Sequence, residues 1–447
     1  MTLEEKVGMC SGADFWRLKS VEHLGIPTVM VSDGPHGLRK QSDEADFSDI
    51  NNSIKAVCFP TGATTACSFD RNLLKTLGCA LGEECQAENV AVLLGPAINI
   101  KRSPLCGRNF EYFSEDPYLT GEMAASHITG VQSQHVGTSL KHFACNNQES
   151  YRMTASAEVD ERTLREIYLP GFERAVKSAR PWTVMTSYNR LNGEFTSESH
   201  YLLTDILRNE WGFDGYVMSD WGAVNNRVKG LKAGMDLEMP GSNGTNDQLL
   251  LQAVKDGTLS EEVLNKSVER ILRKIFEFVD NRKPVIFDKE EHHRLARHIA
   301  TESAVLLKND DVLPLKATDT KIAFIGAFAK EPRYQGGGSS HINAFKVSSA
   351  LDAVAGMDHI HFAQGFVTDV DETREDLLNE AIELAKSSEV AVIFAGLPDS
   401  SESEFYDRTH MKLPNCQNEL IKQVPAVQPN TVVVLHNGSP VEMPWVD

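Results

Sequence analysis

The sequence has little that would suit a membrane protein, a nucleic-acid-binding protein or a secreted protein. Its apolar stretches stay well short of the roughly 20 residues that a membrane helix requires. Its first residues lack the basic, apolar and small-residue regions of a signal peptide. Basic residues number 44 against 63 acidic ones, and the formal net charge is −19. Because nucleic acids and anionic membranes attract basic patches, we expect a cytoplasmic protein that binds neither of them.

The sequence also lacks the cysteine spacing of a zinc site or a disulfide framework. Its eight cysteines are scattered and include no Cys-x-x-Cys pair. A chain of 447 residues can bury enough apolar side chains to fold without disulfides. The histidines at 292, 293 and 298 do not share the i, i+4 spacing of a metal-binding pair, so we expect them to be solvated. The pattern predicts mostly buried free thiols, no bound metal and a neutral substrate.

The first 280 residues alternate between short apolar runs and helical stretches. This alternation predicts a parallel sheet with crossover helices. Several of the runs end in polar or charged residues, as the strands of a (β/α)₈ barrel do at its catalytic face. We therefore predict a TIM-like barrel over residues 1–280. The expected strands are 28–32, 91–94, 137–142, 182–187 and 215–219.

A second, smaller domain is expected after the barrel. An amphipathic helix over 259–278 ends the first domain, and residues 281–302, which include a helix at 290–301, form the linker. Residues 303–447 then predict an α/β sandwich. Its last strand has no covering helix behind it, so the sandwich looks C-terminally incomplete, and a homo-oligomer is one way to cover the exposed face. The expected elements are strands at 304–307, 321–326, 390–396 and 431–435 and a helix at 374–386.

Asp220 is the leading candidate for a catalytic nucleophile. It follows the apolar run 216–218, which has the composition of a strand buried on both faces of a parallel sheet. Such strands present reactive groups at their C-terminal ends. A structural alternative is that Asp220 caps a helix starting near Ala223. The neighbouring Trp221 offers a flat apolar surface that can either stack on a sugar ring or fill the core.

Other strand ends and loops carry polar side chains that could act with Asp220. Cations beside carboxylates keep them ionised, and they can also bind a polyhydroxyl ligand; Lys141 and Arg152 are expected near Asp220 in this way. Each also has a structural alternative, since Arg108 could pair with Glu111 or Glu115, and Arg152 could cap the loop after Glu149. Lys141 could also form a Schiff base, as in a lyase. The full set is Asp33, Arg108, Lys141, His142, Arg152, Tyr188, Asp220 and Trp221.

Five runs resemble motifs of glycoside hydrolase family three in its β-glucosidase branch. They occur in the same order as in that family. The resemblance covers essentially the whole chain. The runs are Ser-Asp-Gly-Pro-His-Gly at 32–37, Gly-Arg-Asn-Phe-Glu at 107–111, Lys-His-Phe at 141–143, Ser-Tyr-Asn-Arg-Leu-Asn-Gly at 187–193 and Val-Met-Ser-Asp-Trp at 217–221.

The resemblance assigns a role to each candidate. It implies that Asp220 is the nucleophile and that Trp221 is an apolar wall for the sugar. The acidic run 402–408 is similar to the family's acid/base loop, which makes Glu404 the general acid/base. Ser339 or Ser340, in the glycine-rich run 336–341, would contact the sugar; a phosphate-loop reading lacks its Gly-Lys-Ser/Thr. The implied sugar binders are Asp33, Arg108, Lys141, His142, Arg152 and Tyr188.

One residue departs from the family pattern in the acid/base loop. The family usually has Gly directly after the catalytic glutamate, and this chain has Phe405. Gly takes backbone angles that are closed to Phe, so the roles of Glu402 and Glu404 stay open at this point. Without the resemblance, the same acidic run would be read as a solvated surface loop.

The resemblance implies a retaining, exo-acting β-glucosidase without a cofactor. Such an enzyme hydrolyses terminal β-D-glucosyl residues of oligosaccharides or aryl β-glucosides by double displacement. Three alternatives remain: a β-xylosidase of the same family, a catalytically impaired sugar-binding fragment, and a Schiff-base lyase that uses Lys141.

Overall fold

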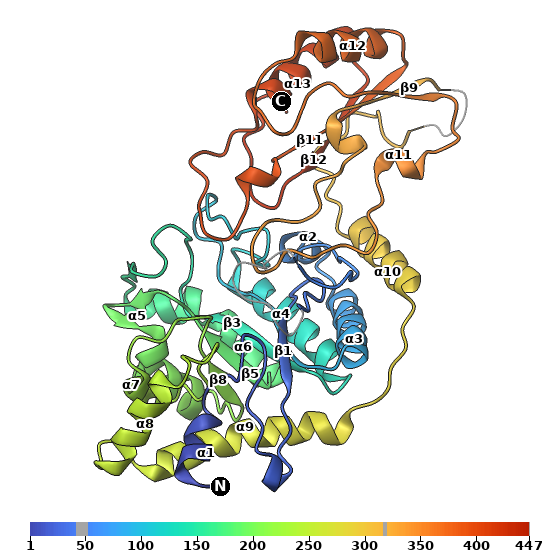
Figure 1. Cartoon of the computed structure of the whole chain (residues 1–447). Helices are drawn as coiled ribbons and strands as arrows, with labels where there is room; N and C mark the ends of the chain where they lie inside the picture. Colours follow the sequence, from blue (N-terminus) through green and yellow to red (C-terminus); the bar gives the residue numbers. More distant parts are fainter. Residues whose placement is uncertain (42–51, 316–319, 447) are drawn as a thin grey trace. The chain divides into compact units, whose positions relative to one another are not determined.

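The computed structural model describes residues 1–41, 52–315 and 320–446, which fold as two compact units (Figure 1). The first unit comprises Met1–Ser103, Glu111–Ser303 and Gly338–Phe345. The second unit comprises Pro104–Phe110, Ala304–Gly337 and the chain from Lys346 onward. Each unit thus includes one short segment that the chain order alone would place in the other.

The first unit is built around five parallel strands, which confirms the five strands expected in this region. Each strand is buried along its whole length, as in a parallel sheet that is covered on both faces. The spatial order is β1-β2-β3-β5-β8. Their bounds are Met30–Asp33 for β1, Val90–Leu94 for β2, Gly137–Phe143 for β3, Thr183–Thr186 for β5 and Tyr216–Met218 for β8.

Short bridging segments complete the barrel between β8 and β1. They pair through single bridges and form no further long strand in the described residues, so the barrel has five regular strands and an irregular closure. The bridges join Met218 to Leu237, Glu238 to Ser11, Gly12 to Leu18, and Arg17 to Met30.

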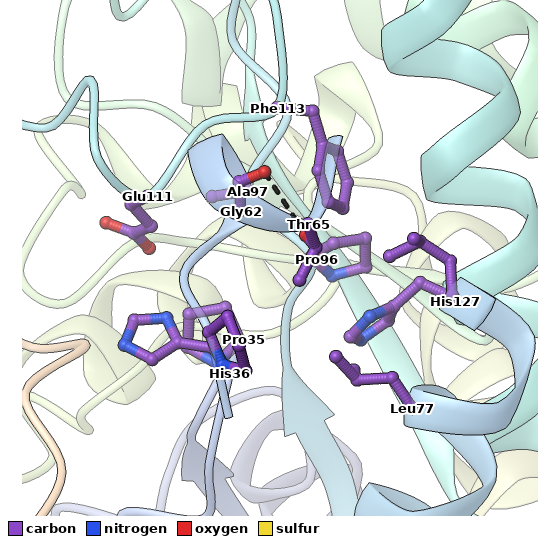
Figure 2. Close-up of a pocket in the computed structure, with 12 residues that line it drawn as sticks. Pro35, His36, Gly62, Thr65, Leu77, Pro96, Ala97, Glu111, Phe113 and His127 are labelled. Carbon is purple, nitrogen blue, oxygen red and sulfur yellow. Dashed lines mark hydrogen bonds between the residues drawn. The ribbon is translucent and has the colours of Figure 1, made fainter. Parts of the chain in front are cut away.

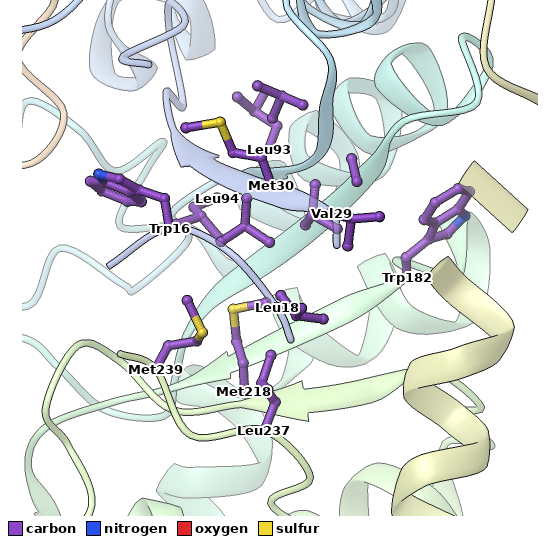
Figure 3. Packing of buried hydrophobic residues seen from close by; sticks show 14 of the residues in the cluster. Trp16, Leu18, Val29, Met30, Leu93, Leu94, Trp182, Met218, Leu237 and Met239 are labelled. Atoms are coloured by element: carbon purple, nitrogen blue, oxygen red, sulfur yellow. The ribbon is translucent and has the colours of Figure 1, made fainter. Parts of the chain in front are cut away.

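Side chains of β8 alternate between two apolar clusters of the first unit. Tyr216 and Met218 of β8 belong to one cluster, and Val217 between them belongs to the other. This is the two-residue period of a strand. Figure 3 shows part of the cluster that includes Met218 and Leu18.

Helices surround the strands of the first unit. The backbones of α3 and α4 approach each other closely at Gly130. A Cβ there would lie 2.2 Å from the carbonyl oxygen of Lys75. Ser260 caps α9, the amphipathic helix expected near the end of this unit. In the described parts of the chain, no helix has both the length and the apolarity of a membrane span. The longer helices are α3 (Arg71–Ala87), α4 (Pro117–Gln132), α6 (Pro170–Ala179), α8 (Thr245–Lys255), α9 (Glu261–Asn281) and α10 (Lys289–Glu302).

Shorter elements connect these strands and helices. They are α1 (Leu3–Gly8), η1 (Glu22–Leu24), α2 (Gly62–Ala66), β4 (Ser156–Ala157), α5 (Glu161–Thr163), η3 (Leu164–Tyr168), β6 (Arg190–Leu191), β7 (Glu194–Phe195), η4 (Thr196–Glu198), η5 (Tyr201–Glu210) and α7 (Arg227–Ala233).

The second unit is a four-stranded parallel sheet with helices packed against it. The spatial order is β10-β9-β11-β12, and β12 lies at the edge of the described sheet. Helices α12 and α13 contact each other and the sheet, which confirms the α/β sandwich. The elements are β9 (Ile322–Ile325), η6 (Ala327–Ala329), α11 (Ala350–Ala353), β10 (Ile360–Ala363), α12 (Glu375–Lys386), β11 (Val390–Gly396), η7 (Asp399–Ser401), α13 (Asn415–Val427) and β12 (Thr431–His436).

Three sequence predictions differ from the structure. The strand expected at 304–307 does not form, and Val305, Leu306 and Leu307 are exposed, since no described strand pairs with them. Strand β10 was not predicted because it is only four residues long and His361 interrupts its apolar pattern. Of the three histidines expected to be solvated, His298 is exposed, but His292 and His293 are buried. His292 lies 2.8 Å from Glu84, which explains how a polar ring is accommodated there.

Candidate active site

The C-terminal rim of the barrel gathers the predicted site residues of the first unit. Because all five strands are parallel, their carboxyl ends lie at the same rim. Asp33 ends β1, and Lys141 and His142 lie near the end of β3. Tyr188 and Asp220 follow β5 and β8. All five side chains are buried.

Asp33 and Lys141 belong to a chain of alternating buried charges. The Arg39 guanidinium lies 2.9 Å from one Asp33 oxygen, and the Lys141 ammonium lies 3.6 Å from the other. Lys141 also lies 3.8 Å from Glu111. Each buried charge therefore faces an opposite one, which is the condition for keeping charges in a protein interior. A Schiff-base lysine must attack a carbonyl carbon, whereas the Lys141 ammonium is engaged with two carboxylates.

Asp220 contacts the backbone of Trp221 and the ring of His142. Its Oδ1 accepts a hydrogen bond from the Trp221 N–H at 2.8 Å, and its Oδ2 lies 3.7 Å from Nε2 of His142. Lys141 pairs with Asp33 and Glu111, and Arg152 pairs with Glu149 at 2.8 Å.

The helix-capping alternative for Asp220 also fails. Helix α7 begins at Arg227, and Asn226 is its cap. Asp220 therefore lies on a loop after a strand, where it is not needed to start a helix.

Asn99 fixes the position of His142. Its amide nitrogen donates to the His142 carbonyl at 2.9 Å, and its side-chain oxygen accepts from the His142 backbone N–H at 3.0 Å. The same oxygen lies 3.3 Å from Nδ1 of the ring. Asn99 thus orients the His142 ring from its Nδ1 side, while Nε2 faces Asp220.

Aromatic rings surround Asp220 on the barrel rim. Trp221 packs 5.4 Å from the ring of Trp16, and its indole N–H donates to the Phe15 carbonyl at 3.0 Å. Tyr188 donates its hydroxyl to the Trp221 carbonyl at 3.1 Å, and Arg152 lies over the Tyr188 ring at 4.5 Å. Trp221 is 8 % exposed, so it fills the core at least in part.

Ser339 lies in the segment Gly338–Phe345, which belongs to the first unit. Its carbonyl oxygen accepts a hydrogen bond from Arg39 at 3.3 Å, and Arg39 also pairs with Asp33. Ser340 is 1 % exposed. Ser339 therefore contacts, through its backbone, the charged rim formed by Asp33, Arg39, Lys141 and Glu111.

Glu404 lies on a tight turn of the second unit. Ser403 and Tyr406 form an isolated antiparallel bridge, which makes Glu404 and Phe405 the central residues of the turn. Glu404 is 5 % exposed, and its carboxyl lies 3.4 Å from the guanidinium of Arg108, which belongs to the same unit. Arg108 therefore pairs with Glu404. The structural alternative had named Glu111 or Glu115 as its partner.

The carboxyl of Glu402, two residues before Glu404, contacts several donors. One oxygen accepts from the Ser439 hydroxyl at 2.5 Å, and the other accepts from the Gly438 N–H at 3.1 Å. Arg333 lies 3.4 Å from the second oxygen. A carboxylate with this many donors anchors the loop.

Several residues of these networks were missed by the sequence analysis. Arg39 and Glu111 lie in or next to quoted motifs, so their positions after β1 and beside the Gly-Arg-Asn-Phe run were the available signal. Asn99 had no such signal, because its contact with His142 joins segments 43 residues apart.

The comparisons with known proteins bear on both units. The glycosyl hydrolase family 3 N terminal domain matches residues 16–274, and the glycosyl hydrolase family 3 C-terminal domain matches residues 304–447. The chain belongs to glycosyl hydrolase family 3.

Similar proteins of this family carry two different activities in their names. The chain is 62 % identical to the thermostable beta-glucosidase B of Acetivibrio thermocellus, and 48 % identical to an exo-alpha-(1->6)-L-arabinopyranosidase of Bifidobacterium longum. Both matches cover the whole chain but 60 % of the relative. The chain thus spans about three fifths of the length of these two family members.

Solved structures of family 3 members agree with the fold. A Bifidobacterium adolescentis β-glucosidase matches with a TM-score of 0.93 at 48 % identity, covering 99 % of this chain and 64 % of that one. A Thermotoga neapolitana β-glucosidase 3B, solved with glucose, matches with a TM-score of 0.89 at 38 % identity, covering 99 % of this chain and 68 % of that one.

A small cavity of the first unit lies beside Glu111 of the charged rim (Figure 2). His36, from the turn after β1, and His127, from α4, both line it, as does Glu111. Among the described residues, neither ring nitrogen of His36 has a hydrogen-bond partner. The same holds for Nε2 of His127. Burial lowers the pKa of each imidazole from 6.5 to about 4. Both rings are therefore neutral at pH 7.

These two histidines make the first unit sensitive to acid. Glu111 favours the charged form of His36, whereas His341 and Lys141 oppose it, and His36 opposes the charged form of His127. Since the folded pKa lies below the unfolded one, the unfolded chain binds more protons, and stability is lost as pH falls from 6.5 toward 4. Each histidine accounts for up to about 3 kcal/mol of this loss.

We predict that His127→Gln reduces the acid sensitivity of folding. The free energy of unfolding, measured with urea between pH 7 and 4.5, should fall less steeply than in the unchanged protein, by up to about 1.4 kcal/mol per pH unit. His298→Gln, which replaces an exposed histidine, is the matched control and should leave the slope unchanged. Equal slopes in all three proteins would contradict the prediction.

Proposed function

We propose that this chain is the catalytic part of a retaining, exo-acting β-glucosidase. The observation that carries the proposal is the buried Asp220 at the carboxyl end of a barrel strand, in a chain 62 % identical throughout to a protein named as a β-glucosidase. A carboxylate at that position can reach a substrate bound at the rim.

In the proposed reaction, Asp220 attacks the anomeric carbon and forms a covalent glycosyl ester. Glu404 protonates the departing glycosidic oxygen and then removes a proton from the water that hydrolyses the ester. The two carboxyls thus need different protonation states at the start of the cycle. His142, oriented by Asn99, is proposed to position Asp220 and to contact the sugar.

The charged rim is proposed to bind the terminal sugar. Asp33 offers acceptors for sugar hydroxyls, and Lys141 and Arg152 offer donors. Arg108 of the second unit is a further proposed donor to the sugar. Trp221 and Tyr188 offer apolar ring surface, and the Ser339 segment adjoins Arg39. A neutral, hydroxyl-rich ring satisfies such a set of donors and acceptors without adding charge to the buried network.

A pentose is the second candidate for the sugar. The 48 % identity to an exo-alpha-(1->6)-L-arabinopyranosidase favours it. Arabinopyranose and xylose both lack the hydroxymethyl group of glucose, so one test covers the arabinopyranosidase and β-xylosidase alternatives. A pocket distinguishes such a small difference by roughly 10- to 200-fold in kcat/KM.

We predict that the chain hydrolyses 4-nitrophenyl β-D-glucoside with a kcat/KM at least about tenfold above that for the β-D-xyloside and the α-L-arabinopyranoside. The physical reason is the contact area that the hydroxymethyl group adds. The measurement is the initial rate with each substrate, on the same preparation.

Each outcome of this comparison has one meaning. A preference for either pentose would overturn the glucose assignment. Glucose binding in calorimetry without turnover of any substrate would support the sugar-binding-fragment alternative. The Asp220→Asn variant is the control for contaminating activity.

We also predict that Glu404→Gln and Glu402→Gln differ in their dependence on the leaving group. Without its acid, Glu404→Gln should lose about 10²- to 10⁴-fold in kcat/KM on an alkyl β-glucoside. It should lose far less on 2,4-dinitrophenyl β-glucoside, whose leaving group needs no proton. Glu402→Gln disturbs an anchor and should lower both rates by the same factor.

The comparison of the two variants decides between the carboxyls. A leaving-group dependence in Glu402→Gln, together with none in Glu404→Gln, would assign the acid/base to Glu402. Added azide should restore turnover of the activated substrate by Glu404→Gln, because it attacks the glycosyl ester without a general base.

A further inference from the structure

Phe405 has a backbone conformation that a bulky residue rarely adopts. Its φ is +88°. It is the second central residue of the turn closed by Ser403 and Tyr406. A type II turn requires positive φ at this position, and glycine is the residue that supplies it without strain. The chain therefore keeps a strained phenylalanine where a glycine would fit the backbone better.

The surrounding backbone prevents the turn from relaxing. A Cβ on Gly107 would lie 1.8 Å from the Tyr406 carbonyl oxygen and 2.3 Å from that of Ser403, so the two backbones are in direct contact. The Gly107 N–H also donates to Asp407 at 3.0 Å. On the other side, the Glu404 N–H donates to the Gly337 carbonyl at 3.1 Å. These contacts hold the turn, and with it the angle of Phe405.

Burial in the core does not account for the phenylalanine either. Its side chain is 59 % exposed, whereas the neighbouring Glu404 is 5 % exposed. A strained residue that gains little from burial points to a role in binding or catalysis. The ring is the part of Phe405 that glycine would lack, so the role belongs to the ring.

We propose that Phe405 is a binding surface for the leaving group of the substrate and selects flat, apolar aglycones such as aryl groups. The proposal rests on the proposed function, because Glu404 is the residue assigned to the leaving oxygen. Phe405 is the next residue along the chain, about 3.8 Å away from Cα to Cα. Whatever is bonded to that oxygen lies within reach of the ring, and an aromatic face stacks on an aryl group.

The test measures the affinity of the whole chain for phenyl 1-thio-β-D-glucoside and methyl 1-thio-β-D-glucoside, which differ only in the aglycone. Calorimetry should show tighter binding of the phenyl compound. In Phe405→Ala this preference should fall roughly 5- to 10-fold, and in Phe405→Tyr it should be kept. Phe405→Gly, which removes the ring and suits the backbone angle, should show the same loss if the alanine variant folds poorly.

Phe69 provides a matched control. It is also a phenylalanine at positive φ, +53°, and it is 71 % exposed. Phe69→Ala should leave the phenyl-to-methyl preference unchanged. An unchanged preference in both Phe405→Ala and Phe405→Gly would overturn the proposal, as would equal affinity for the two compounds, or no binding of either, in the unchanged protein.

Turnover of aryl β-glucoside on the same preparations separates this inference from the proposed function. A chain that shows the Phe405-dependent preference but no turnover contradicts the β-glucosidase assignment alone. A chain that turns over the glucoside with no effect of Phe405 contradicts the aglycone surface alone.

Discussion

The parallel direction of the barrel strands is the constraint on which the site depends. It places the carboxyl ends of β1, β3, β5 and β8 at one rim, so polar residues that are distant in sequence become neighbours there. Buried charges are costly unless each has a partner. The pairs that Lys141 forms with Asp33 and Glu111 satisfy this requirement, and they also leave a concentrated set of donors and acceptors for a ligand rich in hydroxyl groups.

The segment 402–406 of the second unit holds two carboxylates in different surroundings. Glu402 uses both of its carboxyl oxygens to hold the loop, and the carboxyl of Glu404, two residues later, lies 3.4 Å from the guanidinium of Arg108. The fixed backbone then carries Phe405 at an angle that costs conformational energy. Two carboxylates of the same short run can therefore serve different purposes because their surroundings differ.

Much of the fold could be predicted from the sequence, because strands buried on both faces are apolar runs bounded by turn residues. The strand at 304–307 was a wrong prediction, since an apolar run forms a strand only when another strand pairs with it. The irregular closure of the barrel could not be predicted, because single bridges such as that between Met218 and Leu237 leave no periodic pattern. For the site, motifs located the strand ends, but pairing partners such as Asn99 depend on tertiary contacts that no local pattern encodes.

The most direct test of the account is covalent trapping with an activated 2-deoxy-2-fluoro-β-D-glucoside, followed by intact mass measurement and peptide mapping. The fluorine slows hydrolysis of the glycosyl ester that a retaining enzyme forms on its nucleophile. The account predicts one fluoroglucosyl group per chain, attached to Asp220. A label on another carboxylate, or a folded protein that stays unlabelled while the Asp220→Asn variant behaves identically, would contradict it.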